Sequence, residues 1–68
     1  MDTAFYDLCW DAVQRGYFVE VRDREGWTLF VTPCWASALV AEEYAHHKAN
    51  KRGFHLVRNR GRSIAANR

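Results

Sequence analysis

The fold of this chain is decided by residues 32–53, which read TPCWASALVAEEYAHHKANKRG. We expect one long helix here, because the hydroxyl of Thr32 suits an N-cap and Pro33 suits the first helical position. Gly53 follows the last turn, where a residue with positive φ often ends a helix. A stripe of small side chains at helical spacing predicts close packing of this helix against a sheet. The stripe consists of Cys34, Ala38, Ala41, Ala45 and Ala49.

Residues 3–15 are expected to form another helix that precedes the long one. Asp2 or Thr3 would cap its start, and Gly16 would end it. Its apolar residues recur at the i, i+3, i+4 and i+7 positions that place side chains on one helix face. This inward face would consist of Phe5, Leu8, Cys9 and Ala12.

Between these helices the hydrophobic period changes to two, as is typical of half-buried strands. Residues 17–22 and 27–31 alternate in this way, and residues 23–26 predict a hairpin turn between them. Residues 54–57 form a short apolar run that predicts a third strand after the long helix. We therefore expect an α+β fold with the order α-β-β-α-β. Its small antiparallel three-stranded sheet would have the order 2-1-3, with residues 54–57 beside residues 17–22, and the long helix would cover one face.

A single small domain is expected over residues 1–68, because so short a chain has no room for a second core. The end of the chain leaves two alternatives open. Either residues 62–65 add a short fourth strand, or residues 59–68 form a flexible basic tail.

The composition excludes several classes of protein. Hydrophobic residues make up 49% of the chain and aromatic residues 15%, which is typical of a folded chain and not of a disordered one. No apolar run is long enough to span a membrane and no leader opens the chain, so we expect a cytoplasmic protein without a membrane partner. Cys9 and Cys34 allow one disulfide at most, and we expect both to be reduced and buried.

The charged residues divide the chain into an acidic and a basic part. All eight acidic residues precede residue 46, whereas seven of the ten Lys and Arg residues follow it. Such a basic end is suited to docking onto nucleic acid, or onto a protein complex that handles nucleic acid. The expected contacts are Arg58, Arg60 and Arg62, which an extended segment would present on one side about 6–7 Å apart, together with Lys48, Lys51 and Arg52. The alternative interpretation is a solvated basic edge that keeps a small protein soluble and prevents pairing between sheet edges.

Two further patterns are weaker candidates for chemistry. Glu42 and Glu43 each lie one turn before a histidine, and such pairs either supply metal ligands or stabilise a helix surface. The two pairs face different directions, so we expect no metal and no other cofactor. No nucleophile elbow, phosphate loop or paired-carboxylate motif accompanies Cys9 or Cys34. We therefore expect a protein that is not an enzyme and takes no small-molecule substrate.

The aromatic residues are too many for so small a core. Phe18 and Phe30 are expected on the sheet face that the long helix leaves uncovered, and Tyr6 and Trp10 widen the apolar arc of the first helix. Exposed aromatic residues of this kind suggest a protein interface, a homodimer or a stacking platform for bases. The alternative is that the first helix covers this face.

Residues 27–45 resemble the corresponding part of small three-stranded DNA-binding domains of the AP2 type, over less than a third of the chain. The base-contacting strand pattern of that family is not evident here. Small size, abundant aromatic residues and missing catalytic motifs are also common among phage and mobile-element proteins that disable host machinery, including anti-CRISPR proteins. This second analogy is one of class and has no motif behind it.

The sequence therefore predicts a non-catalytic interaction protein. Its basic C-terminal end would dock onto nucleic acid or onto a complex that handles nucleic acid. The alternative is a small inhibitor of the phage or mobile-element type, which would block a host protein through exposed aromatic residues and arginines.

Overall fold

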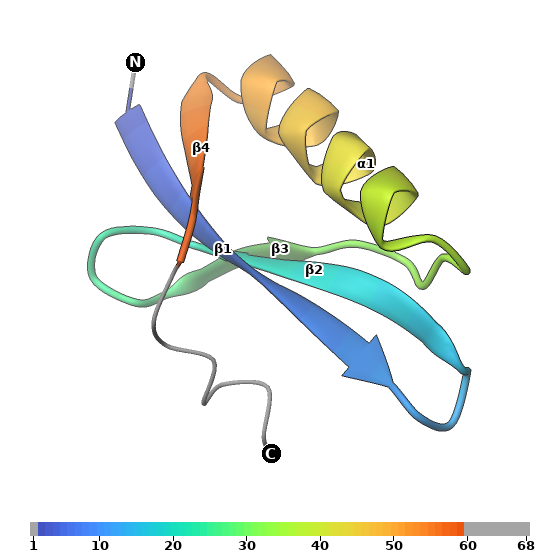
Figure 1. Cartoon of the computed structure of the whole chain (residues 1–68). Coiled ribbons are helices and arrows are strands. Elements are labelled where there is room, and N and C mark those ends of the chain that lie inside the picture. Colours follow the sequence, from blue (N-terminus) through green and yellow to red (C-terminus); the bar gives the residue numbers. More distant parts are fainter. Residues whose placement is uncertain (1, 60–68) are drawn as a thin grey trace.

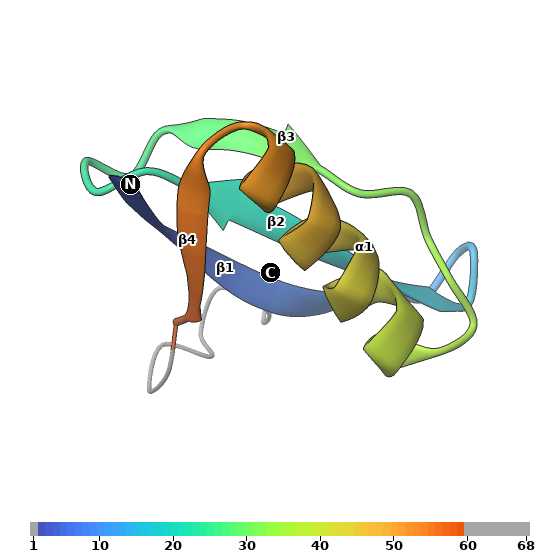
Figure 2. The same cartoon turned by 90° about the horizontal axis from the view of Figure 1, so that it is seen from above.

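A four-stranded sheet with one helix against one of its faces forms the protein (Figures 1 and 2). The computed structural model describes residues 2–59. Along the chain the elements are β1 (Asp2–Asp11), β2 (Gly16–Arg22), β3 (Thr28–Val31), α1 (Ala38–Lys51) and β4 (Phe54–Arg58). The strands lie in the order β3-β2-β1-β4, in which β4 runs parallel to β1 and the other neighbours are antiparallel. The predicted α+β class is confirmed, as are strands in the three segments expected to form them.

The prediction of a helix over residues 3–15 is wrong, because Asp2–Asp11 form the long strand β1. Its side chains alternate: Ala4 and Tyr6 are buried beneath α1, and Leu8 packs beside them. The backbone of β1 is hydrogen-bonded to β2 along residues 5–11 on one side and to β4 along residues 2–6 on the other. The element order is therefore β-β-β-α-β, and no first helix exists that could cover the second face of the sheet.

The predicted sheet order 2-1-3 is also wrong. The strand after α1 pairs with β1 in parallel, with Ala4 opposite Leu56, and not with β2. On the other side of β1, Tyr6 lies opposite Val21 in the antiparallel ladder with β2. The N-terminal strand thus occupies the place that the prediction gave to residues 54–57, and the sheet is mixed with four strands.

The long helix begins five residues later than predicted, at Ala38, with Ser37 as its N-cap. The hydroxyl of Thr32 instead accepts a hydrogen bond of 2.9 Å from the backbone N–H of Val19 and donates to the carbonyl of Pro33. The chain then continues along β2, where Tyr17 and Trp35 exchange two backbone hydrogen bonds of 2.7 and 2.8 Å. Residues 32–35 thus form an extended segment that supplies hydrogen-bond partners to the backbone of β2. Thr32 takes part in these bonds and is not available as a helix N-cap.

The end of the helix and its small-residue stripe agree with the prediction. Gly53 follows α1 with a φ of 85° and donates its N–H to the carbonyl of Asn50. Ala41, Ala45 and Ala49 are completely buried, so α1 lies close to the sheet, where it packs on β1, β2 and β4. Cys34 of the predicted stripe lies outside the helix. The core consists of Ala4, Tyr6, Val19, Val21, Phe30, Ala41, Ala45, Ala49 and Leu56.

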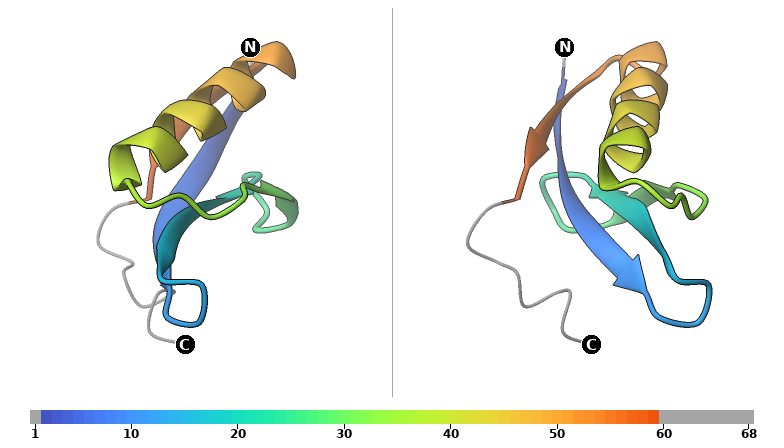
Figure 3. Two further views of the ribbon diagram at one scale, coloured as in Figure 1. Left: turned by 90° about the vertical axis from the view of Figure 1, so that its right-hand side faces the viewer. Right: turned by 45° about the vertical axis from the view of Figure 1, so that its right-hand side comes forward.

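The second face of the sheet carries the alternate residues of the same strands, and no described helix lies on it (Figure 3). Its polar centre contains Glu20, which accepts a hydrogen bond from Thr28 at 2.8 Å and forms an ion pair with Arg22 at 3.1 Å. Phe18 lies on this face, opposite Cys9, as expected. Apart from Asn59, both alternatives for the end of the chain concern residues that lie outside the described range 2–59.

Candidate nucleic-acid interface

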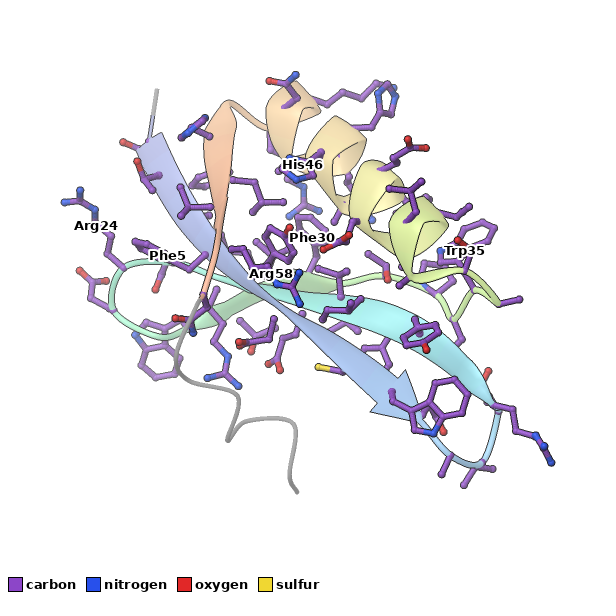
Figure 4. The ribbon with its side chains drawn as sticks, viewed as in Figure 1. Phe5, Arg24, Phe30, Trp35, His46 and Arg58 are labelled. Atoms are coloured by element: carbon purple, nitrogen blue, oxygen red, sulfur yellow. The ribbon has the colours of Figure 1, made fainter. Side chains whose placement is uncertain are left out.

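Phe30 of β3 anchors a group of cations at the C-terminal end of α1. Its buried ring points towards the helix, and the Lys48 Nζ lies 5.2 Å from the ring centroid (Figure 4). The guanidinium carbon of Arg52 lies 5.1 Å from the same centroid, and its Nη1 donates to the carbonyl of Leu29 at 3.5 Å. Cation–π contacts of this kind hold two long side chains in place on the β3 side of the helix.

A hollow of about 260 Å³ adjoins these cations on the surface of α1, and no carboxylate lines it. Its lining consists of Tyr44, His47, Lys48 and Lys51. Tyr44 lies beneath Lys48, at 5.9 Å from Nζ to ring centroid, and its other neighbour is the ring of Trp35 at 5.7 Å. The negative end of the helix dipole favours positive charge at this position. We call His47, Lys48, Lys51 and Arg52 together the basic surface.

Arg58, the first of the three predicted arginines, lies on the other side of α1. Its Nη1 is 3.5 Å from Oε2 of Glu42, and the hydroxyl of Tyr6 donates to the same oxygen at 3.1 Å. His46 stacks edge-on against Tyr6, with ring centroids 5.5 Å apart. The Arg58 side chain is 51% exposed but lies beside a carboxylate, so its charge is partly neutralised.

The six predicted basic residues therefore do not form one patch. Lys48, Lys51 and Arg52 lie together beside β3. Arg58 is the last residue of β4, at the opposite edge of the sheet. Arg60 and Arg62 lie outside the described residues. Tyr44 and Phe30 were not predicted to lie beneath these cations, although the i, i+4 spacing of Tyr44 and Lys48 is a signal for the first of them.

The aromatic residues predicted at an interface fall into two groups. Tyr6 and Phe30 belong to the core, and the expectation that Phe30 points to the uncovered face is wrong, because it lies opposite the core residue Val21. Trp10 is 53% exposed and packs edge-on against Tyr17 at 4.9 Å, beyond the end of the helix. The most exposed aromatic residue is one the prediction placed on a strand, Trp27, with 73% of its surface accessible.

Thiol or metal chemistry within the described residues 2–59 would require a particular arrangement of the cysteines or of the side chains that could bind a metal. Among the described residues, no three His, Cys, Asp or Glu side chains are grouped as a metal would require, and neither Cys9 nor Cys34 is in a disulfide. Partial burial raises the pKa of the Cys34 thiol, and the nearby Asp11 carboxylate raises it further. A nucleophilic thiol needs the opposite shift.

No protein-family model, curated protein or solved structure matches this chain. The likeness to AP2-type domains thus has no support beyond the residues that suggested it. Among residues 2–59, no helix has the length and apolar character needed to cross a membrane.

Proposed function

We propose that this protein is a non-catalytic module that docks the phosphate backbone of a nucleic acid on the basic surface of α1. The observation that carries this proposal is a hollow lined by His47, Lys48 and Lys51 and by none of the described carboxylates, with Arg52 nearby over the ring of Phe30. Lys and Arg side chains in such an arrangement replace condensed counterions on the phosphates, and the released ions drive binding.

The packing of the cations on aromatic rings supports the proposal. Lys48 and Arg52 lie over Phe30, so part of the side-chain entropy that a flexible cation loses on binding is already lost in the free protein. Lys51 is exposed and completes the positive surface. A planar guanidinium such as that of Arg52 also suits two-point contact with a phosphate.

Arg58 has a secondary role in this proposal. Arg58 lies across the helix from the basic surface and beside Glu42. It would therefore contribute long-range attraction for an anionic strand and would not fix the position of that strand. Arg60 and Arg62 follow it in the sequence and would extend the same attraction.

The second candidate function is inhibition of a host protein, which the protein would bind through exposed aromatic residues and arginines. The observation in its favour is the exposure of Trp10 and Trp27, since aromatic residues are over-represented among the residues that dominate protein interfaces. The two side chains lie at different places, one at the end of β1 and the other in the β2–β3 connection. This alternative predicts binding that depends on Trp and not on the basic surface.

The proposal is tested by fluorescence anisotropy with labelled DNA and RNA of mixed sequence, single- and double-stranded, at two salt concentrations. The test variant combines Lys51→Gln and Arg52→Gln, and the matched control combines Arg15→Gln and Arg24→Gln, which removes two exposed Arg side chains elsewhere. We expect micromolar binding by the wild type and at least a tenfold loss in the double variant. The slope of log affinity against log salt should fall by about two, since each lost phosphate contact contributes about 0.9.

Three outcomes would contradict the proposal. Equal losses in the control would show that only total charge matters and would overturn the assignment of the basic surface. No binding by the wild type to any of the four probes would reject the nucleic-acid proposal. Loss of nucleic-acid binding on Trp10→Ala or Trp27→Ala, with the Lys51 and Arg52 variant unaffected, would place the contact on the exposed Trp side chains and would also overturn the assignment of the basic surface.

A further inference from the structure

The two outer edges of the sheet differ in how well they are protected from pairing with another strand. The β3 edge has only four residues, and its register shifts between Val21 and Arg22 because Leu29 is an extra residue. Arg52 of α1 also reaches the outward carbonyl of Leu29. A short strand, a bulge and a covering cation are all devices that block edge-to-edge association.

The β4 edge has none of these devices in the described part of the chain. It has five residues in an unbroken register with β1, contains no Pro, Lys or acid, and is the last strand in the sheet order (Figure 3). Its only strong charge, Arg58, is drawn over α1 by Glu42 and so does not cover the edge.

The orientation of the β4 backbone follows from one hydrogen bond. The N–H of Asn59 donates to the carbonyl of Tyr6 at 2.8 Å, with Tyr6 in register with Arg58. Backbone groups alternate in direction along a strand, so residues 55, 57 and 59 face β1. The N–H and C=O groups of Phe54, Leu56 and Arg58 therefore face away from the sheet.

We propose that this edge pairs with β4 of a second copy of the chain. The two strands run antiparallel across a twofold axis at Leu56, so that Leu56 lies opposite its own counterpart and Phe54 lies opposite Arg58 of the second copy. All three outward-facing residues then form the closely spaced, hydrogen-bonded pairs of an antiparallel ladder. The two sheets join into one continuous sheet with both helices on the same side.

The side chains of β4 suit this self-pairing and argue for a second copy over an unrelated strand. Arg58 meets Phe54 and His55 meets Val57, so no two like charges lie directly opposite each other. Val57 is exposed on the second face of the sheet and would gain a neighbour. An isologous contact also closes after two copies, so the pairing ends at a dimer and does not propagate.

Sedimentation velocity of the full-length protein tests the proposal over a range from micromolar to millimolar concentration. We expect the mass to rise towards twice the 8.0 kDa of the chain. The test variant is Arg58→Pro, which removes an outward N–H that the ladder with β1 does not use. The matched control is Arg58→Gln, which also removes the Glu42 ion pair but keeps the N–H. Only the proline variant should lose the dimer.

Amide hydrogen exchange of the wild type gives a second test that does not depend on the folding of a variant. The amides of Phe54, Leu56 and Arg58 should become protected as the concentration rises, while the Val31 amide at the β3 edge should not. A wild type that stays monomeric at millimolar concentration overturns the proposal. So does a dimer that survives Arg58→Pro, or one that Arg58→Gln already dissociates, since the contact would then not be this backbone edge.

Discussion

The two margins of the sheet carry similar residues in opposite arrangements. The β3 margin, which consists of β3 and the basic surface above it, has a protected backbone edge and cations without a carboxylate among them. The β4 margin, which consists of β4 with Glu42 and Arg58, has an unprotected backbone edge and a cation beside a carboxylate. At the β3 margin, Arg52 donates a hydrogen bond to the backbone of the edge strand. At the β4 margin, Arg58 instead forms an ion pair with Glu42 of α1.

The two proposals assign a separate binding mode to each of these margins. The basic surface lies at the β3 margin, where the backbone edge is protected, so we assign the anionic partner to that margin. At the β4 margin the backbone groups of the edge strand face outward and Glu42 partly neutralises the charge of Arg58. We therefore assign the second copy of the chain to the β4 margin. A dimer formed in this way presents two basic surfaces, and one nucleic acid that reached both would bind more tightly than either surface alone.

The largest expected effect is at Phe30, the ring that supports the β3 margin. Phe30→Ala should lower the free energy of unfolding by about 3–5 kcal/mol, because it leaves a cavity beneath Lys48 and Arg52. Phe30→Leu keeps most of the apolar volume and should cost about 1–2 kcal/mol while still weakening nucleic-acid binding. Urea unfolding measures both variants. Wild-type stability in Phe30→Ala would contradict the role of the ring.

The next largest loss of stability is expected at Thr32, which follows β3 and whose hydroxyl accepts a hydrogen bond from β2. Thr32→Val should cost about 1–3 kcal/mol, since the buried N–H of Val19 loses its acceptor. The matched control is Thr28→Val in β3, whose hydroxyl bonds to Glu20 at an exposed position and should matter much less. Equal losses in the two variants, measured by urea unfolding, would show that the buried hydrogen bond is not the reason.

A substitution at Glu42 would leave the β4 margin, like the β3 margin, with a cation that has no carboxylate beside it. Glu42→Gln removes the carboxylate beside Arg58 and should change the free energy of unfolding by about 1 kcal/mol or less, as is usual for an exposed ion pair. Nucleic-acid affinity should rise severalfold, because Arg58 would then lie beside a neutral amide and add its full charge to that of the basic surface. Glu25→Gln in the β2–β3 connection is the control, and an equal rise there in the anisotropy assay would attribute the gain to net charge alone.

The smallest expected effect lies in the β1–β2 turn, which belongs to neither margin. Oδ1 of Asp11 accepts hydrogen bonds from the N–H groups of Gln14 and Val13, which hold the pKa of that carboxyl below its usual value. Because the folded pKa is the lower one, this stabilisation is complete above the unfolded pKa of about 4 and is lost as the pH falls further. Asp11→Asn should flatten the Tm profile in that acid range and leave both binding modes unchanged. A steeper acid profile in the variant would refute this explanation.

Much of the fold could be predicted from local pattern. The alternation of Tyr17, Val19 and Val21 and the stripe of Ala41, Ala45 and Ala49 appear in the structure as expected. These segments have one dominant period, and each buries the face that its period selects.

The N-terminal strand could not be predicted in the same way. Its sequence fits two periods, since Leu8 belongs both to a helical stripe with Phe5 and to an alternating series with Ala4 and Tyr6. Pairing with β2 and β4 selects the strand, and these contacts are distant in the sequence. The division of the basic residues between two margins follows from the same strand, because β1 separates β4 from the rest of the sheet.

The assignment of the anionic partner to the β3 margin is tested most directly by an NMR titration of the ¹⁵N-labelled protein with a short single-stranded oligonucleotide. The account predicts that amide shifts concentrate between Tyr44 and Arg52 and at Phe30, with the amides of Phe54–Arg58 little changed. Shifts centred on β4, or on the second face of the sheet around Phe18, would contradict it.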